Sequence, residues 1–390
     1  NNTLAPKPGR YIGPWQEVTS EKLKYDLSKY NEKYFERLKD FLNVAQRLNI
    51  IVEITLFTSI YQDKTWLVCP QNPINNINLP DSISRIEVHT LNNKGLWAYQ
   101  KALVQKIVKE LNPYNNLFYE IQNEPWSDRT VPVYNIVNKE ALVKNDWTNK
   151  ADFADEASLK WQSEIAAVIT NEESKLAKKH LIAQNYSNFK ASIPYVNDPI
   201  SIINFHYAWP EAVQLNYHYN KVIGFDESGF AGSDDLVYRR QAWQFMLSGG
   251  SLFNNLDYSF SVGNENGKGA YKSPGGGSTA LRKQLKVLRE YLHSFDLVKL
   301  KPNYTSTISA PGLITYTLSD QDKVFAVYLK AMGTPKSTLR LSANGRYSVT
   351  AVNTISGDQQ DLGDFKSDQG VLTIPILIPE GELALKLVKR

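Results

Sequence analysis

Cysteine and long apolar runs are scarce in this sequence. Its 390 residues include a single cysteine, Cys69, which excludes an internal disulfide and any zinc site built from cysteines. No apolar run approaches the roughly 18 residues of a transmembrane helix, so we expect no membrane span. The chain starts at Asn1 without a signal segment, which fits a mature product or a chain whose targeting segment has been removed. We expect a secreted or periplasmic protein.

An excess of one charge is lacking as well. The chain has 44 basic and 40 acidic residues, a net charge of +4, spread without long runs. Nucleic-acid binding requires a basic stripe or patch, so we do not expect nucleic acid as a partner. The hydrophobic and charged fractions, 42% and 22%, are close to those of ordinary globular proteins. These fractions exclude a disordered chain, a collagen-like repeat and a coiled coil.

Several catalytic motifs are missing. Residues 263–269 (GNENGKG) resemble a phosphate loop, but three residues stand where that motif has four, and Gly269 replaces its hydroxyl residue. No Gly-x-Ser-x-Gly elbow marks a serine hydrolase. No metal-binding spacing relates the five histidines, which are His89, His180, His206, His218 and His293. We therefore expect neither a metal nor another cofactor.

Helix and strand patterns alternate between residue 32 and about residue 297. Apolar residues at three- and four-residue spacing predict helices over residues 32–48, 95–111, 157–178, 236–247 and 279–294. Short apolar runs predict strands at residues 50–57, 117–122, 180–184, 200–205, 221–226 and 251–257. This alternation indicates a parallel α/β sheet, open or closed.

The pattern changes near residue 298, where the last helix pattern ends. Short alternating strands separated by turn residues such as SANG and SGDQ follow to the end of the chain. They predict a small antiparallel β-sandwich. We therefore expect two domains, residues 1–297 and residues 298–390.

Aromatic residues are abundant. The 22 tyrosines, 15 phenylalanines and 8 tryptophans make up 12% of the chain, and many stand beside Asn, Gln or Pro. Such rings suit sugar binding, although packing in cores and loops is their more common role. Composition alone leaves both interpretations open.

Two glutamates follow predicted strands in the same position. The run 117–122 ends in Asn123-Glu124-Pro125, and the run 221–226 ends in Asp226-Glu227. The carboxyl ends of parallel strands meet at one face of a barrel, where active sites are built. A glutamate there, beside a side-chain amide, is well placed for general acid/base work; capping of the next helix is the structural alternative for Glu124.

A third strand end lies between these two in the chain. The run 200–205 is followed by His206, Tyr207 and Trp209, which are residue types expected to hold a carboxylate and a sugar ring. We expect the glutamates, the histidine and the aromatic residues at these three strand ends to form one site.

With these residues the sequence resembles the clan A glycoside hydrolases, most closely the cellulase-like family 5 group. The resemblance implies a (β/α)8 TIM barrel, a poly- or oligosaccharide substrate and retaining hydrolysis of a β-glycosidic bond. It implies that Asn123 contacts the sugar 2-hydroxyl, that Glu124 is the acid/base and that Glu227 is the nucleophile. His206 matches the histidine of barrel strand 6. The tail, through YSVTAVNTISG, is similar to the β-sandwich of some bacterial members.

The sequence departs from the family at two places in the sugar site. Ala208 stands where a tyrosine often follows the strand 6 histidine, and Tyr207 or Tyr258 is expected to replace it. Residues 256–260 contain no tryptophan at the end of the last barrel strand. Further candidates for sugar contacts stand just past predicted strand ends, although loop packing would explain them equally well; they are Trp126, Asn185, Tyr186 and Trp209.

Strands 1 and 2 of the barrel are not identifiable. If residues 50–57 form strand 3, nothing in residues 1–31 resembles the two preceding strands or the arginine that the family carries on strand 2. Six strands cannot close an eight-stranded barrel. Either another segment completes the sheet, or the functional molecule has an upstream segment of about 60 to 100 residues, on the scale of two βα units. We expect the upstream segment.

Other functions are compatible with the same residues. A carbohydrate-binding or scaffolding protein on a degenerate glycosidase barrel is the alternative from another class, and the retention of both glutamates argues against it. A transglycosylase would have the same sequence features, and only its products would distinguish it.

Overall fold

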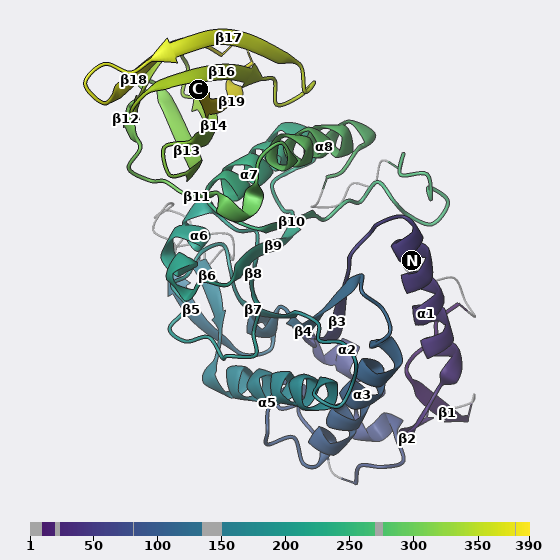
Figure 1. Ribbon diagram of the computed structural model, residues 1–390. Coiled ribbons are helices and arrows are strands. Elements are labelled where there is room, and N and C mark those ends of the chain that lie inside the picture. The colour runs from purple at the N-terminus through teal and green to yellow at the C-terminus, as the bar shows by residue number, and fades with distance from the viewer. Residues whose placement is uncertain (1–9, 20–23, 81, 135–149, 270–275, 379) are drawn as a thin grey trace. The chain divides into compact units, whose positions relative to one another are not determined.

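The computed structural model describes residues 10–19, 24–80, 82–134, 150–269, 276–378 and 380–390 (Figure 1). The chain divides into two compact units. We call residues 5–206 with 219–222 the N-terminal unit, and residues 207–218 with 223–390 the C-terminal unit. Among the described residues, no helix combines the length and the apolar character that crossing a membrane requires.

The described residues of the N-terminal unit form four parallel strands, which lie in the order in which they occur in the chain. They are β3 (Val52–Thr58), β4 (Leu117–Asn123), β7 (Ile182–Asn188) and β8 (Ile202–His206). The strands alternate with α1 (Glu32–Arg47), α3 (Leu96–Leu111) and α5 (Glu156–Glu173). Strands β7 and β8 are buried along their whole length, as expected for a parallel sheet covered on both faces.

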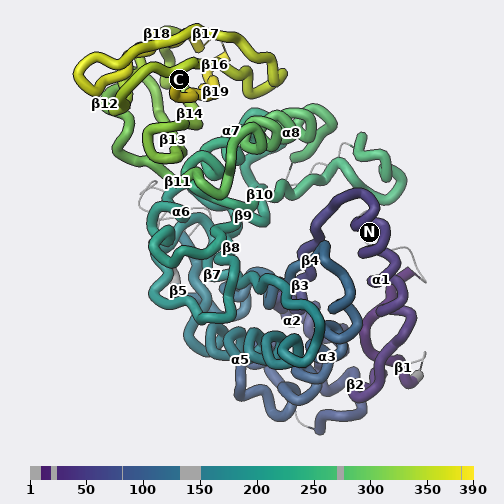
Figure 2. The backbone as a smooth tube through the Cα atoms, viewed as in Figure 1, coloured from purple at the N-terminus to yellow at the C-terminus, as the bar shows by residue number. Residues whose placement is uncertain are grey.

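Two antiparallel hairpins in the N-terminal unit were not predicted. The hairpin of β1 (Trp15–Thr19) and β2 (Lys24–Tyr30) forms a sheet of its own next to α1 (Figure 2). This described segment therefore does not supply two further parallel strands. The second hairpin joins β5 (Thr130–Tyr134) to β6 (Lys150–Ala154), and β6 continues onto β7.

The C-terminal unit continues the alternation of strands and helices. Its parallel strands are β9 (Val222–Ser228) and β10 (Leu252–Asn255). Its helices are α6 (Pro210–Asn216), α7 (Asp235–Leu247) and α8 (Thr279–His293). The side chains of Asp234 and Ser278 cap α7 and α8 by accepting hydrogen bonds from the first-turn backbone. The predicted fold class is confirmed, because these strands and helices make a partial (β/α)8 barrel followed by antiparallel sheets.

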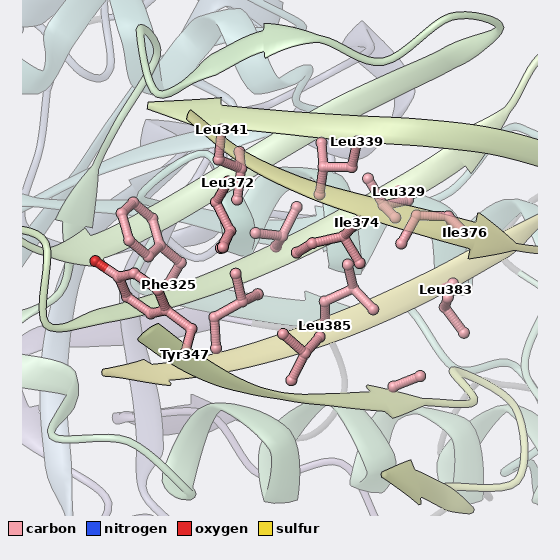
Figure 3. Close-up of a cluster of buried hydrophobic side chains, with 14 of the residues drawn as sticks. Phe325, Leu329, Leu339, Leu341, Tyr347, Leu372, Ile374, Ile376, Leu383 and Leu385 are labelled. Carbon is pink, nitrogen blue, oxygen red and sulfur yellow. The ribbon is translucent and has the colours of Figure 1, made fainter. Parts of the chain in front are cut away.

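The antiparallel part of the C-terminal unit consists of two sheets. The order of the first is β11 (Lys301–Pro302), β13 (Leu313–Asp320), β14 (Val324–Ala331), β19 (Glu382–Lys389), β16 (Arg346–Val352) and β17 (Gln359–Lys366). The order of the second is β12 (Thr307–Ser309), β15 (Lys336–Ser342) and β18 (Val371–Leu377). Alternate residues of β15 and β18 are buried, and Figure 3 shows leucines and isoleucines of these strands among the core side chains. This period of two is the pattern that predicted the sandwich.

The sandwich shares a second core with helices α7 and α8. Trp243 of α7 stacks on Tyr328 of β14 with ring centroids 5.5 Å apart. The Tyr291 hydroxyl of α8 donates a 2.6 Å hydrogen bond to the carbonyl oxygen of Leu385. The described structure thus joins the last two helices and the sandwich through buried contacts. The predicted domain boundary between residues 297 and 298 stays a prediction.

A buried ion pair lies in this shared core. Arg239 of α7 donates to Glu382 of β19 from Nε at 3.0 Å and also from Nη2. The Tyr328 hydroxyl donates to the other carboxylate oxygen at 2.7 Å. Burial and the nearby Glu382 charge raise the pKa of Tyr328, so that it remains a donor. Glu382 therefore depends on these donors, because solvent does not reach it.

Replacement of Arg239 by methionine is expected to destabilise the protein by about 3 to 5 kcal/mol, because it leaves a buried carboxylate without its main partner. Denaturant unfolding followed by circular dichroism measures the change. The exposed pair between Lys286 and Glu290 of α8 offers a matched control, and Lys286→Met should leave the unfolding midpoint almost unchanged. Equal midpoints for the two variants would contradict a stabilising role for the buried pair.

Candidate active site

Glu124 directly follows β4 and has an unusual backbone conformation. Its φ of 49° and ψ of 56° lie in the left-handed region, which is unfavourable for a residue with a side chain. Pro125 comes next and begins a short 3-10 helix over Pro125–Ser127. Proline cannot continue the strand ladder, because it lacks a backbone N–H. The strand therefore stops here, and Glu124 stands at its carboxyl end.

The Glu124 carboxyl group has a partner on each oxygen. Tyr61 donates its hydroxyl to Oε2 at 2.8 Å. His206, at the end of β8, lies with Nδ1 3.0 Å from Oε1. The imidazole is almost completely buried, whereas 13% of the Glu124 side chain is exposed. The Trp126 ring packs edge-to-face on His206 with centroids 5.3 Å apart. The carboxyl group is thus oriented by protein groups while part of it remains accessible.

Two asparagines predicted to contact sugar lie beside Glu124. Asn123 donates its side-chain amide to the Tyr61 hydroxyl at 2.8 Å. The Asn185 side-chain oxygen accepts the backbone N–H of Glu124 at 3.2 Å, and its amide nitrogen donates to the buried Glu120. Asn185 is fully buried, so its observed contacts are with the protein around Glu124.

Tyr61 was not among the predicted site residues. It follows β3 by three residues, at the same edge of the sheet as the end of β4. An aromatic residue just past a strand end was the signal that would have identified it. Its contact with Glu124 depended on the loop that begins at this residue.

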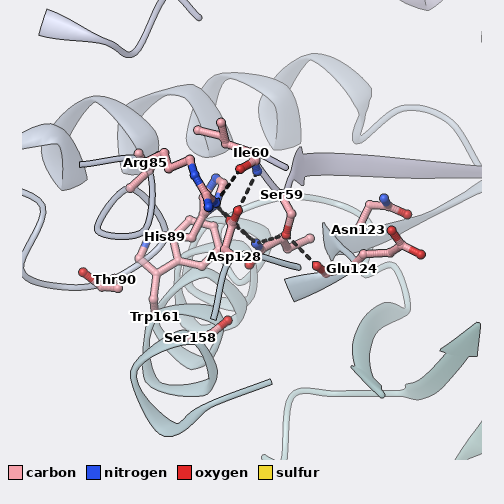
Figure 4. A network of polar contacts seen from close by, with 12 residues as sticks. Ser59, Ile60, Arg85, His89, Thr90, Asn123, Glu124, Asp128, Ser158 and Trp161 are labelled. Carbon is pink, nitrogen blue, oxygen red and sulfur yellow. Dashed lines mark hydrogen bonds and ion pairs between the residues drawn. The ribbon is translucent and has the colours of Figure 1, made fainter. Parts of the chain in front are cut away.

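A second group of polar side chains contacts the backbone of Glu124 through Ser59. His89 contacts Asp128, and Gln122 donates hydrogen bonds to both Asp128 and Ser59. Figure 4 shows Ser59 in turn donating to the Glu124 carbonyl oxygen. The side chains of His89 and Asp128 are buried, with only 2% and 3% exposed. No local sequence pattern predicted this network.

Glu227 belongs to the C-terminal unit, near the end of β9. Tyr207 donates its hydroxyl to Glu227 Oε1 at 2.8 Å, and its backbone N–H donates to the Glu227 carbonyl oxygen at 2.8 Å. Like Glu124, Tyr207 has a positive φ, of 52°. Its ring packs edge-to-face on Phe230 at 5.3 Å. Tyr207, one of the two tyrosines considered as the replacement at Ala208, contacts this glutamate.

The other predicted sugar contacts lie in varied surroundings. Tyr186 of β7 is almost fully buried, and its hydroxyl donates to Gln184 at 2.9 Å. Burial raises the pKa of Tyr186, so the hydroxyl stays protonated. Trp209 is half-buried at the start of α6, and Tyr258 is half-buried past the end of β10. Their contacts with sugar stay predictions.

Asp257 anchors the backbone next to Tyr258. Its carboxylate accepts hydrogen bonds from the backbone and the hydroxyl of Ser259 at 2.9 and 2.6 Å, and from Arg282 at 2.6 Å. Gly277 packs against Asp257 with a φ of 105°, and a Cβ there would clash with the carboxylate.

Metal binding was tested within each unit separately. Among the described residues of either unit taken by itself, no three His, Cys, Asp or Glu side chains place their ligand atoms within 4.8 Å of one another.

The sequence matches no protein-family model and no curated protein. Solved structures do match. A glycoside hydrolase family 5 protein from Bacteroides vulgatus ATCC 8482 has 12% identity and a TM-score of 0.60, over 91% of this chain and 74% of that one. A second structure, described as a glycoside hydrolase, has 11% identity and a TM-score of 0.55, over 91% and 89% of the two chains. At this identity the likeness shows the fold, which is the cellulase-like glycoside hydrolase fold that the sequence predicted.

Proposed function

We propose that this protein is a retaining glycoside hydrolase that cleaves β-glycosidic bonds in a poly- or oligosaccharide. The observation that carries the proposal is the setting of Glu124. Its carboxyl group stands at the carboxyl end of a parallel strand, is held by Tyr61 and His206 and keeps partial access to solvent. A general acid needs this combination, because it must be oriented and must also reach the substrate. The glycoside hydrolase fold of the chain supports the same reaction.

Glu227 is the nucleophile in this proposal. A carboxylate that attacks a sugar must be ionised, and a hydrogen bond from a neutral hydroxyl stabilises the ionised form. Tyr207 supplies this bond to one oxygen of Glu227.

The reaction proceeds in two displacements. Glu227 forms an ester bond to the anomeric carbon while the glycosidic C–O bond breaks, and Glu124 gives its proton to the leaving oxygen. Water then attacks the same carbon and loses a proton to Glu124, and the Glu227 carboxylate is released. This mechanism requires the two carboxyl groups to be about 5 to 5.5 Å apart.

Substrate contacts follow from the same assignment. Asn123, next to Glu124, binds the 2-hydroxyl of the sugar in the glycosyl-enzyme. Asn185 holds the Glu124 backbone N–H, and its contact with the sugar stays a prediction. Trp209 and Tyr258, both half-buried, are the aromatic candidates for stacking on the sugar.

The first product is expected to keep the β configuration, because two inversions at the anomeric carbon restore it. Proton NMR of an aryl β-glycoside reaction, recorded before mutarotation, measures the anomer directly. Glu227→Gln is the control and should give no product. An α-anomer formed first would contradict the retaining mechanism. Tight sugar binding without turnover by the intact protein would favour a carbohydrate-binding function.

A further inference from the structure

Asp128 is the centre of a buried hydrogen-bond network behind Glu124. We call Ser59, His89, Gln122 and Asp128 the Asp128 network (Figure 4). Ser59 follows β3, Gln122 lies in β4, and Asp128 follows the short 3-10 helix Pro125–Ser127. His89 lies in a loop before α3. The Asp128 network therefore links segments far apart in the sequence at the edge of the sheet where Glu124 lies.

Both carboxylate oxygens of Asp128 are occupied. The backbone N–H of Ile60 donates to Oδ1 at 2.7 Å. His89 Nδ1 lies 2.8 Å from Oδ2, and Gln122 donates to the same oxygen at 3.2 Å. The His89 ring is held in turn by Trp161, with ring centroids 4.9 Å apart. Asp128 thus has a fixed place, held by two N–H donors and by its contact with His89.

Ser59 connects the Asp128 network to Glu124. Its hydroxyl accepts a 3.0 Å hydrogen bond from Gln122 and donates a 2.6 Å hydrogen bond to the Glu124 carbonyl oxygen. Its backbone N–H donates to the carbonyl oxygen of Asn123 at 3.1 Å. The backbone N–H of Ile60, the residue after Ser59, donates to Asp128. Together these contacts join residues 59–60 to residues 123–128.

These contacts bear on the backbone of Glu124. A left-handed conformation at a residue with a side chain persists only where surrounding contacts hold it. Ser59 holds the Glu124 carbonyl group and Asn185 holds its N–H group. Because the backbone conformation sets where the side chain points, a change in these contacts would move the carboxyl group.

We propose that Asp128 is a positioning residue that, through Ser59, keeps the Glu124 backbone in the conformation from which its carboxyl group protonates the leaving oxygen. The inference rests on the proposed role of Glu124 as acid/base. A displacement of about 1 Å in a reacting group can cost on the order of 100-fold in rate. Asp128 acts on proton delivery in this way without touching the substrate.

The test is the Asp128→Asn variant, assayed on aryl β-glycosides whose leaving groups differ in acidity. Asparagine cannot accept on both side-chain atoms, so it would lose the acceptor now offered either to the Ile60 N–H at Oδ1 or to Gln122 at Oδ2. We expect kcat to fall about 10- to 100-fold on phenyl glycosides and only a few-fold on dinitrophenyl glycosides, which need little protonation. KM should change by less than about twofold, because no substrate contact is lost.

Two further variants separate positioning from general stability. Asp26→Asn is the matched control, because Asp26 is also a buried carboxylate of the N-terminal unit and accepts hydrogen bonds from Ser28 and Asn78. It should lower the melting temperature and leave the dependence on leaving group unchanged. Ser59→Ala should reproduce the selective loss of Asp128→Asn. The double variant should be no worse than Asp128→Asn alone, because both act through one path.

The outcomes distinguish this inference from the proposed function. An equal loss on all substrates in Asp128→Asn, or no loss in Ser59→Ala, would overturn the positioning role. The proposed function would still stand after such a result, provided that Glu124→Ala shows a selective loss on poor leaving groups. Should Asp128→Asn fail to fold, Ser59→Ala decides alone. A uniform loss in Glu124→Ala would instead overturn the proposed function.

Discussion

Glu227→Ala is expected to abolish hydrolysis of aryl β-glycosides, with a fall in kcat on the order of 10⁴-fold or more. Without the carboxylate that Tyr207 holds, no glycosyl-enzyme can form, whatever the leaving group. Substrate binding should persist, because the substitution removes a reacting group and no bulky contact. Steady-state kinetics measure kcat, and isothermal titration with an intact glycoside measures binding.

Azide provides the decisive control for Glu227→Ala. In place of the missing carboxylate it should attack the anomeric carbon once, giving a glycosyl azide of α configuration. The exposed glutamate Glu290 of α8 serves as the matched residue, and Glu290→Ala should retain full activity. Activity that survives in Glu227→Ala without azide would remove Glu227 from the nucleophile role.

Glu124→Ala is expected to act selectively. Hydrolysis of phenyl β-glycosides should fall about 10²- to 10⁴-fold, the usual contribution of general acid catalysis. Dinitrophenyl glycosides should still form the glycosyl-enzyme at nearly the normal rate, because their leaving groups need no proton. The second step should then become limiting, and a burst of phenol release followed by slow turnover measures this.

Azide again reports the role of the missing group. With Glu124 absent it should attack the glycosyl-enzyme and give a β-glycosyl azide, since two displacements have occurred. Glu124→Gln keeps the size of the side chain and should show the same selectivity. A uniform loss over all leaving groups, in this variant and in Glu124→Ala, would argue against the acid/base role.

The regular elements were largely predictable, because helix and strand periods are local properties. The helix predicted over residues 95–111 is α3 (Leu96–Leu111), and the strand predicted over residues 117–122 is β4 (Leu117–Asn123). The hairpin of β5 and β6 was not predicted. It has no strong alternation of its own in the sequence, and β6 is positioned by pairing with β7.

The candidate site was predictable only in its strand-end residues. Glu124 and Glu227 each follow an apolar run closed by a change in residue type, and parallel strands place such residues at one edge of a sheet. Tyr61 and Ser59 were not predicted, because they contact Glu124 from positions 63 and 65 residues earlier in the chain. Nothing near Glu124 in the sequence identifies such partners.

Periodicity and residue type, which need no knowledge of neighbours in space, determined the alternating helices and strands, the antiparallel tail and the two carboxylates. The tertiary structure alone decided which donor meets each carboxylate. A hydrogen bond depends on distance and direction between atoms, and these are set only when β3, β4, β7 and β8 lie side by side. For the same reason the Asp128 network, and the left-handed backbone that it holds at Glu124, became visible only in the folded chain.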